Sequence, residues 1–133
     1  MARTDRRTFS FPRSARLLRR SDFDALKERG RWFAEGPLAA RWIPRVAGAL
    51  SPGMERGAAR VGIAVSSKVG QAVVRNRVKR RLREAIRHEL SFLPAVDLVL
   101  IARPSATAST VAELRSWLRR AGSRIETDRG DSP

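Results

Sequence analysis

The sequence contains no cysteine and a single histidine. Without cysteine the chain has neither a disulfide framework nor a thiolate metal site, as is usual in a reducing cytoplasm. No apolar run reaches the length of a bilayer span, and residues 1–10 lack the apolar segment of a signal peptide. We therefore expect a soluble, unexported protein located in the cytoplasm.

Acidic side chains are also scarce. Thirteen Asp and Glu stand against 28 Lys and Arg, which gives a formal charge of +15 and a pI of about 11.9. Such a pI is typical of proteins with a basic nucleic-acid-binding surface, so an acidic partner is expected. A length of 133 residues suits one domain with one core.

A regular pattern of basic residues lies between residues 68 and 90. One apolar stripe with helical spacing comprises Val74, Val78, Leu82, Ala85 and Ile86. The opposite face carries Asn76, Arg80, Arg83 and Arg87, flanked by Arg75, Arg77, Lys79 and Arg81. Repulsion between like charges three or four positions apart costs such a helix on the order of 1 to 3 kcal/mol.

A polyanion bound along this face would remove that cost. A merely solvated surface helix usually mixes both signs of charge, so we interpret the stretch as a helix that binds nucleic acid or another polyphosphate. A membrane-surface helix is disfavoured because the apolar stripe is short and holds no Trp or Phe. The pattern by itself does not distinguish RNA from DNA.

The remaining elements predict a small α+β domain. They are a helix over 21–29 capped by Ser21 and ended by Gly30, strands over 38–43, 60–66 and 96–102, and a helix from the capping box Thr110-x-x-Glu113 to Gly122. Pro44 indicates an edge position or a strand end. In the second strand, Val61, Ile63 and Val65 face the core, while Gly62, Ala64 and Ser66 are expected to line a groove floor. The apolar run over 96–102 is typical of a central strand covered on both faces.

The predicted order is α-β-β-α-β-α, with helices packed on a short central sheet. Residues 1–15 are expected to form a flexible basic arm, 16–121 the RNA-binding domain, and 122–133 a flexible tail.

The stretch K-x-G-x-A-V-x-R-N-R-x-K-R, at residues 68–80, resembles the signature of the protein subunit of bacterial ribonuclease P. Flanking matches are R-L and D-F at Arg16, Leu17, Asp22 and Phe23, R-V-G-x-x-V-S at 60–66, and D-x-x-x-I-A-R at 97–103. The resemblance spans residues 16 to 120.

The resemblance implies a non-catalytic protein subunit of an endoribonuclease whose catalytic RNA removes the 5′ leader from precursor tRNA. It also implies Mg²⁺ held mainly by the RNA subunit and the substrate, and a monomeric protein in a 1:1 complex with the catalytic RNA. The family fold carries a left-handed β-α-β crossover, although general rules favour right-handed connections.

Two groups of site residues follow from the resemblance. The RNA-binding helix and its approach would use Lys68, Arg75, Asn76, Arg77, Lys79, Arg80, Arg83 and Arg87. A cleft for the single-stranded leader would use Phe23, Lys27, Arg41, Ser66 and Lys68. The family often has aromatic residues where Lys27 and Arg41 stand, so phosphate contacts or arginine stacking are expected to replace them. Phe23 has the alternative of being a core residue.

A catalytic or metal site in the protein is not predicted. Glu84 lies four residues before His88 on the charged helix, where a surface interaction is the expected outcome. Asp97 suits a strand entry or an arginine partner better than a metal ligand. The alternative function is a ribosomal or other structural RNA-binding protein, and raised cleavage of precursor tRNA by ribonuclease P RNA at low Mg²⁺ would discriminate between the two.

Overall fold

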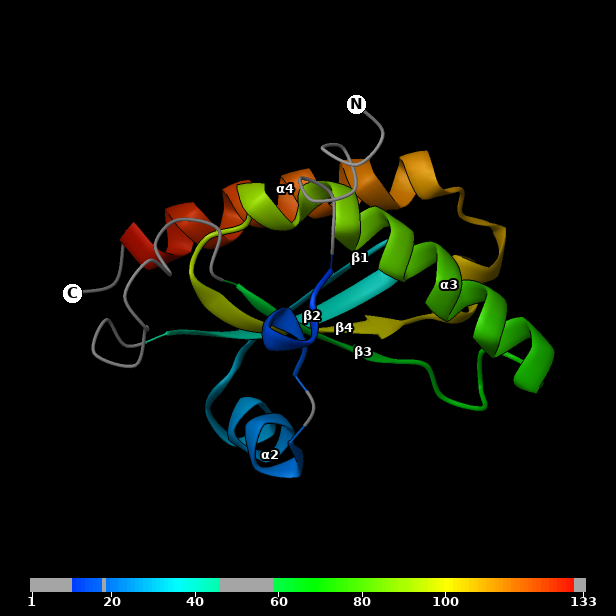
Figure 1. Cartoon of the computed structure of the whole chain (residues 1–133), viewed down its shortest axis with the longest axis horizontal. Helices are drawn as coiled ribbons and strands as arrows, with labels where there is room; N and C mark the ends of the chain where they lie inside the picture. Colours follow the sequence, from blue (N-terminus) through cyan, green and yellow to red (C-terminus); the bar gives the residue numbers. More distant parts are fainter. Residues whose placement is uncertain (1–10, 18, 46–58, 131–133) are drawn as a thin grey trace.

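A four-stranded mixed sheet carries helices α3 and α4 on one face and the shorter helix α2 on the other (Figure 1). This computed structural model describes residues 11–17, 19–45 and 59–130. The elements are η1 (Arg13–Ala15), α2 (Arg20–Arg29), β1 (Arg31–Glu35), β2 (Leu38–Pro44), β3 (Arg60–Ala64), α3 (Ala72–Glu89), η3 (Leu90–Phe92), β4 (Val96–Ala102), η4 (Pro104–Ala108) and α4 (Val111–Gly130).

The sheet order is β1-β2-β4-β3, with β3 parallel to β4 and the other pairs antiparallel. Strand β4 is central and buried along nearly its whole length, as its apolar sequence predicts. Strand β2 is also internal, so Pro44 marks a strand end and not an edge strand. The parallel pair β3 and β4 is joined through α3; the left-handed sense of this crossover stays a prediction.

Strand β1 was not predicted, and the order is α-β-β-β-α-β-α instead of α-β-β-α-β-α. The strand is short, charged at both ends, and buries only Phe33, so its alternation is weak. Its existence depends on pairing with β2 across a two-residue loop. Gly36 enters that loop with φ of 56°, a conformation that glycine adopts without a steric cost.

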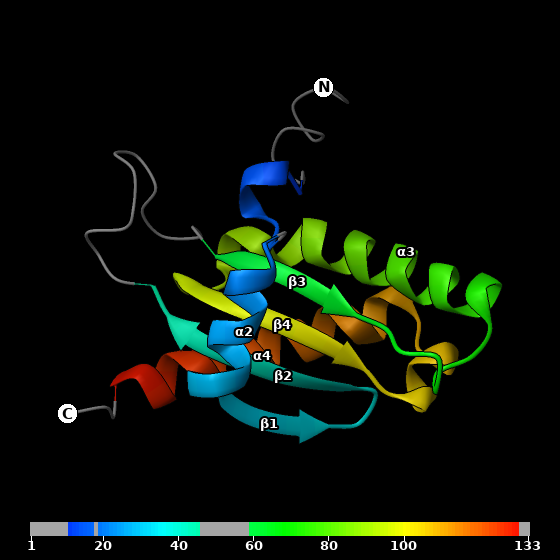
Figure 2. The same ribbon diagram turned by 90° about the horizontal axis from the view of Figure 1, so that it is seen from below.

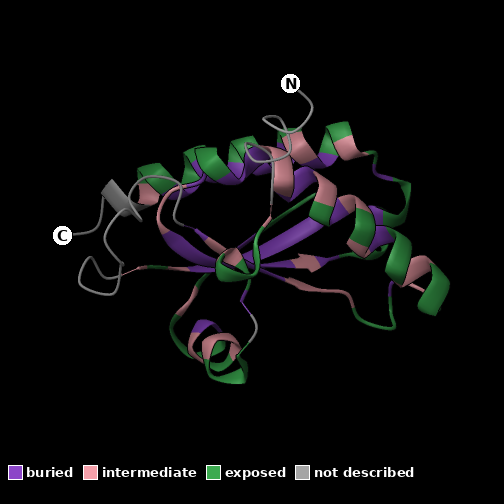
Figure 3. Cartoon of the chain, viewed as in Figure 1, coloured by how far each residue is buried: buried purple, intermediate pink, exposed green. Residues whose placement is uncertain are grey.

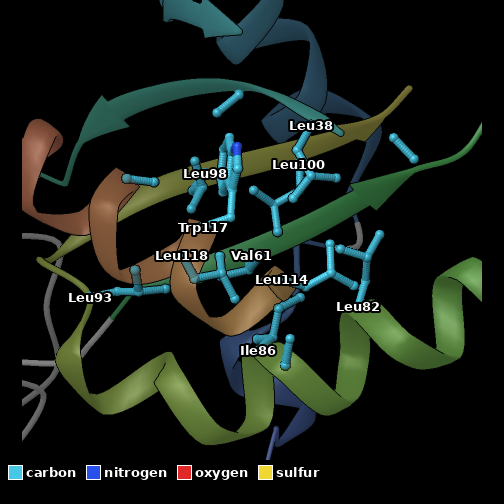
Figure 4. Packing of buried hydrophobic residues seen from close by; sticks show 14 of the residues in the cluster. Leu38, Val61, Leu82, Ile86, Leu93, Leu98, Leu100, Leu114, Trp117 and Leu118 are labelled. Atoms are coloured by element: carbon cyan, nitrogen blue, oxygen red, sulfur yellow. The ribbon is translucent and has the colours of Figure 1, made fainter. Parts of the chain in front are cut away.

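The main core lies between the sheet and the two long helices, where Figure 4 shows their buried side chains facing the strands. The predicted stripe of α3 is confirmed: Val78, Leu82, Ala85 and Ile86 are buried, and Val74 is partly so. Helix α4 contributes Leu114, Trp117, Leu118, Ala121 and Ile125. Figure 3 shows the same division, with buried residues on the inner sides of both helices and exposed residues outside. Burial of each large side chain stabilises the fold by roughly 1.5 to 3 kcal/mol.

Helix α4 begins at the predicted capping box but does not end at Gly122. The Thr110 N–H donates to Glu113 Oε1 at 3.2 Å, and the Glu113 N–H donates to Thr110 Oγ1 at 3.1 Å. The helix then continues to Gly130, and Ile125 is fully buried. The apolar repeat therefore outweighs the cost of about 1 kcal/mol for an internal glycine. Residues 122–130 are accordingly helical, and residues 131–133 of the predicted tail lie outside the described residues.

Helix α2 begins one residue earlier than predicted. Its N-cap is Arg19, which makes no capping side-chain bond, so the assignment of Ser21 as the cap is wrong. The stop at Gly30 is confirmed: a Cβ there would lie 2.2 Å from the Leu26 carbonyl oxygen, which only glycine avoids.

The predicted arm is partly structured. Phe11 and Ala15 pack against the main core, so the packed domain begins before Arg16. Residues 1–10 lie outside the described residues.

Candidate nucleic-acid interface

The outer side of α3 presents a run of exposed polar and cationic side chains. Asn76, Arg77, Arg80 and Arg83 are all exposed, and we call these four residues the cationic face. They are held outward because the opposite stripe of α3 is buried against α4 and the sheet. Within the described chain, Arg77, Arg80 and Arg83 form no ion pair, so no carboxylate of the described residues neutralises them.

The other predicted cations of this helix differ in exposure. Arg75, Lys79 and Arg87 are half-buried at the edges of the cationic face, and Lys68 is exposed on the loop before α3. Arg81 has a structural role instead, since it donates to the Thr107 carbonyl at 3.0 Å and holds η4 against α3.

Glu84 and His88 form the predicted surface interaction, with Nε2 to Oε1 at 3.2 Å. Arg87 also donates to Glu84 at 2.7 Å. Burial raises the pKa of Glu84, but the hydrogen bonds from Arg87 and His88 outweigh it and hold this pKa below its ordinary value. The carboxylate is therefore engaged in neutralising its own helix.

The second predicted surface lies on the α2 side of the sheet. Figure 2 shows α2 crossing the strands and leaving the C-terminal ends of β3 and β4 uncovered. The register of the strands places two rows of side chains on this face, and each row contains one residue from each of the four strands. The mixed row is Gly62, Val99, Arg41 and Trp32. The other row, Ala64, Ile101, Ala39 and Ala34, is called the small-residue row because three of its four residues are alanine.

Phe23 closes the mixed row at its β3 end. A Cβ at Gly62 would lie 2.8 Å from Phe23 Cζ, so the ring rests directly on the glycine. Phe23 is half-buried and packs against the second apolar cluster, which contains Leu17, Leu26 and Val99. The expected free space above Gly62 is therefore filled by Phe23. Ala64 stays half-exposed and Ser66 exposed beyond it.

Arg41 links α2 to the edge of the sheet. Its Nη1 donates to the Lys27 carbonyl at 3.1 Å, and its guanidinium lies 4.9 Å from the centroid of the Trp32 ring. The Lys27 side chain is exposed. Sequence reasoning missed Trp32 because it missed β1; the alternation between Gly30 and Gly36 was the available signal.

The five predicted cleft residues fall into two groups. Phe23, Lys27 and Arg41 lie together at α2, whereas Ser66 and Lys68 follow the end of β3. Ser66 is four residues beyond Gly62, or roughly 13 Å along an extended chain. The uncovered end of the small-residue row lies between the two groups.

An ion-pair network fixes α2 on the sheet. Arg60 donates to Asp97 through Nε at 2.9 Å and Nη2 at 2.7 Å, and Nη2 also reaches Asp22 of α2 at 3.4 Å. The hydrogen bond to Asp97 is the main reason that the pKa of Arg60 is raised. Asp97 is thus an arginine partner, one of the two roles predicted for it.

Over residues 11–17, 19–45 and 59–130, no three or more His, Asp or Glu side chains are grouped so that they could hold a metal ion. The helices of the described chain are too polar or too short to cross a membrane.

Comparison with known proteins identifies a family that this chain resembles over most of its length. The family model described as Ribonuclease P matches residues 11–126. The ribonuclease P protein component of Desulfovibrio desulfuricans is 42% identical over 121 residues, covering 86% of this chain and 88% of that protein. That of Gluconacetobacter diazotrophicus is 40% identical over 118 residues, covering 84% and 95%.

Solved structures show the same fold. The RNase P protein of Staphylococcus aureus superposes with a TM-score of 0.67 at 26% identity, over 86% of this chain and 96% of that one. The RNase P protein of Thermotoga maritima gives 0.66 at 26% identity, over 82% and 96%.

Proposed function

Because the chain belongs to the bacterial ribonuclease P protein family, we propose that its two surfaces bind two different RNA segments of that ribonucleoprotein. As the protein component it assists ribonuclease P RNA in the 5′ maturation of precursor tRNA. The family decides against a ribosomal or other structural RNA-binding protein without attached catalysis.

The cationic face, with Lys68, Arg75, Lys79 and Arg87 around it, binds the catalytic RNA. The supporting observation is that Arg77, Arg80 and Arg83 are exposed in a row on one helix without an internal counter-charge in the described chain. Arginine forks match phosphate oxygens, and their binding releases condensed counterions. The A-form major groove is too narrow for a helix, so α3 lies against backbone and irregular RNA.

The α2 side of the sheet binds the single-stranded leader of precursor tRNA. Phe23 offers the exposed part of its ring for stacking, while Lys27, Arg41 and Lys68 supply positive charge along the face. Stacking and backbone charge tolerate any base, so sequence preference for the leader is modest. Ser66 contributes a hydroxyl at the far end of the same face.

The catalytic chemistry belongs to the RNA, with Mg²⁺ held mainly by the RNA subunit and the substrate. The carboxylates with the shortest ion pairs in the described chain are occupied by arginine; they are Glu84, Glu89 and Asp97. The protein acts as a monomer, in a 1:1 complex with the catalytic RNA, in the cytoplasm where precursor tRNA is made.

The test is cleavage of precursor tRNA by a bacterial ribonuclease P RNA at low Mg²⁺, with and without the protein. The wild-type chain should raise cleavage, and Arg77→Ala/Arg80→Ala should require a higher protein concentration for the same effect. Arg120→Ala/Arg124→Ala removes equal charge from the exposed side of α4 and serves as the control. Equal loss in both double variants would assign the effect to net charge and not to the cationic face.

A further inference from the structure

Trp32 is a large aromatic residue left on the surface. Trp32 is 53% exposed to solvent, whereas Trp42 and Trp117 lie in the core and are 0% and 1% exposed. On the edge strand β1 its neighbour Phe33 points into the core and stacks on Trp117. Strand alternation therefore puts Trp32 on the opposite side, where α2 lies.

The ring is held in place by Arg41. The two residues are directly opposite in the antiparallel ladder, and the guanidinium lies 4.9 Å from the ring centroid. Arg41 is itself fixed by its hydrogen bond to the Lys27 carbonyl at the last turn of α2. An aromatic ring is thus oriented in advance, with a cation beside it and more than half of its surface in solvent.

The surroundings favour RNA over a protein partner. Ala34, the next residue of β1 on this face, is exposed but small, so Trp32 is the one large apolar side chain that β1 exposes. The one charged group that contacts the ring in the described chain is a cation, the Arg41 guanidinium. A π-face with positive charge beside it matches a nucleobase joined to its phosphate.

The small-residue row connects this position to the opposite edge of the sheet. It crosses four strands from Ala64 to Ala34, or about 14 Å at the usual strand spacing. An extended RNA strand lying on this row would reach β1 beside Trp32.

We propose that Trp32 and Arg41 form an outer stacking subsite for one base of the single-stranded 5′ leader, at the β1 edge of the sheet. This subsite rests on the proposed leader-binding function and extends it from α2 to β1. The base stacks on the Trp32 ring, and Arg41 neutralises an adjacent phosphate. The subsite is tolerant of base identity because each base offers a π-face.

The decisive experiment combines abasic substitutions in the leader with the variant Trp32→Ala. Precursor tRNAs, each lacking one leader base, are bound to the assembled holoenzyme. With the wild-type chain, two positions should each weaken binding by roughly five- to 150-fold, the range for one lost base stack: first the base on Phe23, and second the base on Trp32. In Trp32→Ala the second position should have no further effect. Identical abasic profiles in both proteins would overturn the subsite.

Phe92→Ala is the matched control, because Phe92 is 74% exposed but lies on η3, after α3. Its abasic profile should equal that of the wild type. Thermal unfolding of Trp32→Ala checks that the edge strand is intact, and Trp32→Phe supplies a second variant that keeps a stacking ring. Retained sensitivity in Trp32→Phe together with its loss in Trp32→Ala supports stacking, whereas loss in both overturns it.

Tryptophan emission of the full chain gives an independent signal, since Trp32 is the exposed tryptophan of the three. A short single-stranded RNA should quench this emission and protect it from acrylamide, and Trp32→Phe should show neither change. Unaltered emission on saturation with RNA would contradict a base on Trp32.

The outcome also separates the subsite from the function on which it rests. Equal affinity of the wild-type holoenzyme for precursor and mature tRNA would contradict both the leader-binding function and the subsite. A leader-dependent affinity that survives Trp32→Ala undiminished would remove the subsite alone.

Discussion

Glu89 is predicted to be the ionic residue on which the position of the RNA-binding helix most depends. Its side chain is 1% exposed, and it accepts hydrogen bonds from Arg115 Nε at 2.8 Å and from Arg119 Nε at 2.8 Å and Nη2 at 3.3 Å. These bonds join the last turn of α3 to the middle of α4. The change Glu89→Gln keeps the shape but turns an amide N–H₂ towards two guanidinium groups.

The expected cost follows from burial. Breaking a buried pair by removing one partner costs roughly 3 to 5 kcal/mol when the remaining charge stays buried. Here the remaining arginines are 35% and 62% exposed and recover water, so we expect a loss of about 2 to 3 kcal/mol. Glu84→Gln, in an exposed pair one turn earlier, should cost under about 1 kcal/mol.

The same pair predicts a dependence on pH. Burial raises the pKa of Glu89, but the hydrogen bonds from Arg119 and Arg115 outweigh it, and the pKa lies below its ordinary value. Glu89 therefore binds a proton more tightly in the unfolded chain than in the folded protein. Its contribution to the free energy of unfolding is fully present above the ordinary glutamate pKa, about 4.3, and is lost as the pH falls towards the lowered pKa of the folded protein.

Urea unfolding of wild type, Glu89→Gln and Glu84→Gln at pH 7 and at pH 3 to 4 measures both effects. The difference in free energy of unfolding between wild type and Glu89→Gln should be largest at pH 7 and small in acid. A loss below about 0.5 kcal/mol at pH 7, or a gap that does not shrink in acid, would refute the reasoning from burial.

Three further predictions concern function. Arg77→Ala/Arg80→Ala should weaken assembly with the catalytic RNA and flatten its salt dependence by about 0.7 to 0.9 per lost phosphate contact in a plot of log affinity against log salt; an unchanged slope would remove both residues from the interface. The purified protein should not cleave RNA, and His88→Ala should leave holoenzyme turnover nearly unchanged; Mg²⁺-dependent cleavage by RNA-free protein that this change abolishes would overturn the assignment of catalysis to the RNA. Phe23→Ala should lower affinity for precursor tRNA by up to about 1 to 3 kcal/mol and leave that for mature tRNA nearly unchanged, in a variant shown by thermal unfolding to be folded; equal losses for both would assign Phe23 to the core beside Gly62.

Several features could be predicted because the interactions that decide them are local. The stripe of α3, the capping box of α4 and the stop at Gly30 each depend on residues within about one helical turn. The long motif over residues 68–80 identified the family, which the comparisons confirm.

Other features depend on residues far apart in the chain. The end of α4 was predicted at Gly122 from a local stop signal, but burial of Ile125 against the sheet decided otherwise. Free space was expected above Gly62, and the ring of Phe23, from an element nearly forty residues earlier, occupies it.

The sequence by itself determined which helix is cationic, which strand is central and which family the chain belongs to, because charge, periodicity and motif are properties of consecutive residues. Only the tertiary structure decided that β1 exists and that Trp32 stands beside Arg41. A five-residue edge strand with one buried side chain has little preference of its own, and its pairing with β2 creates both the strand and the surface that it carries.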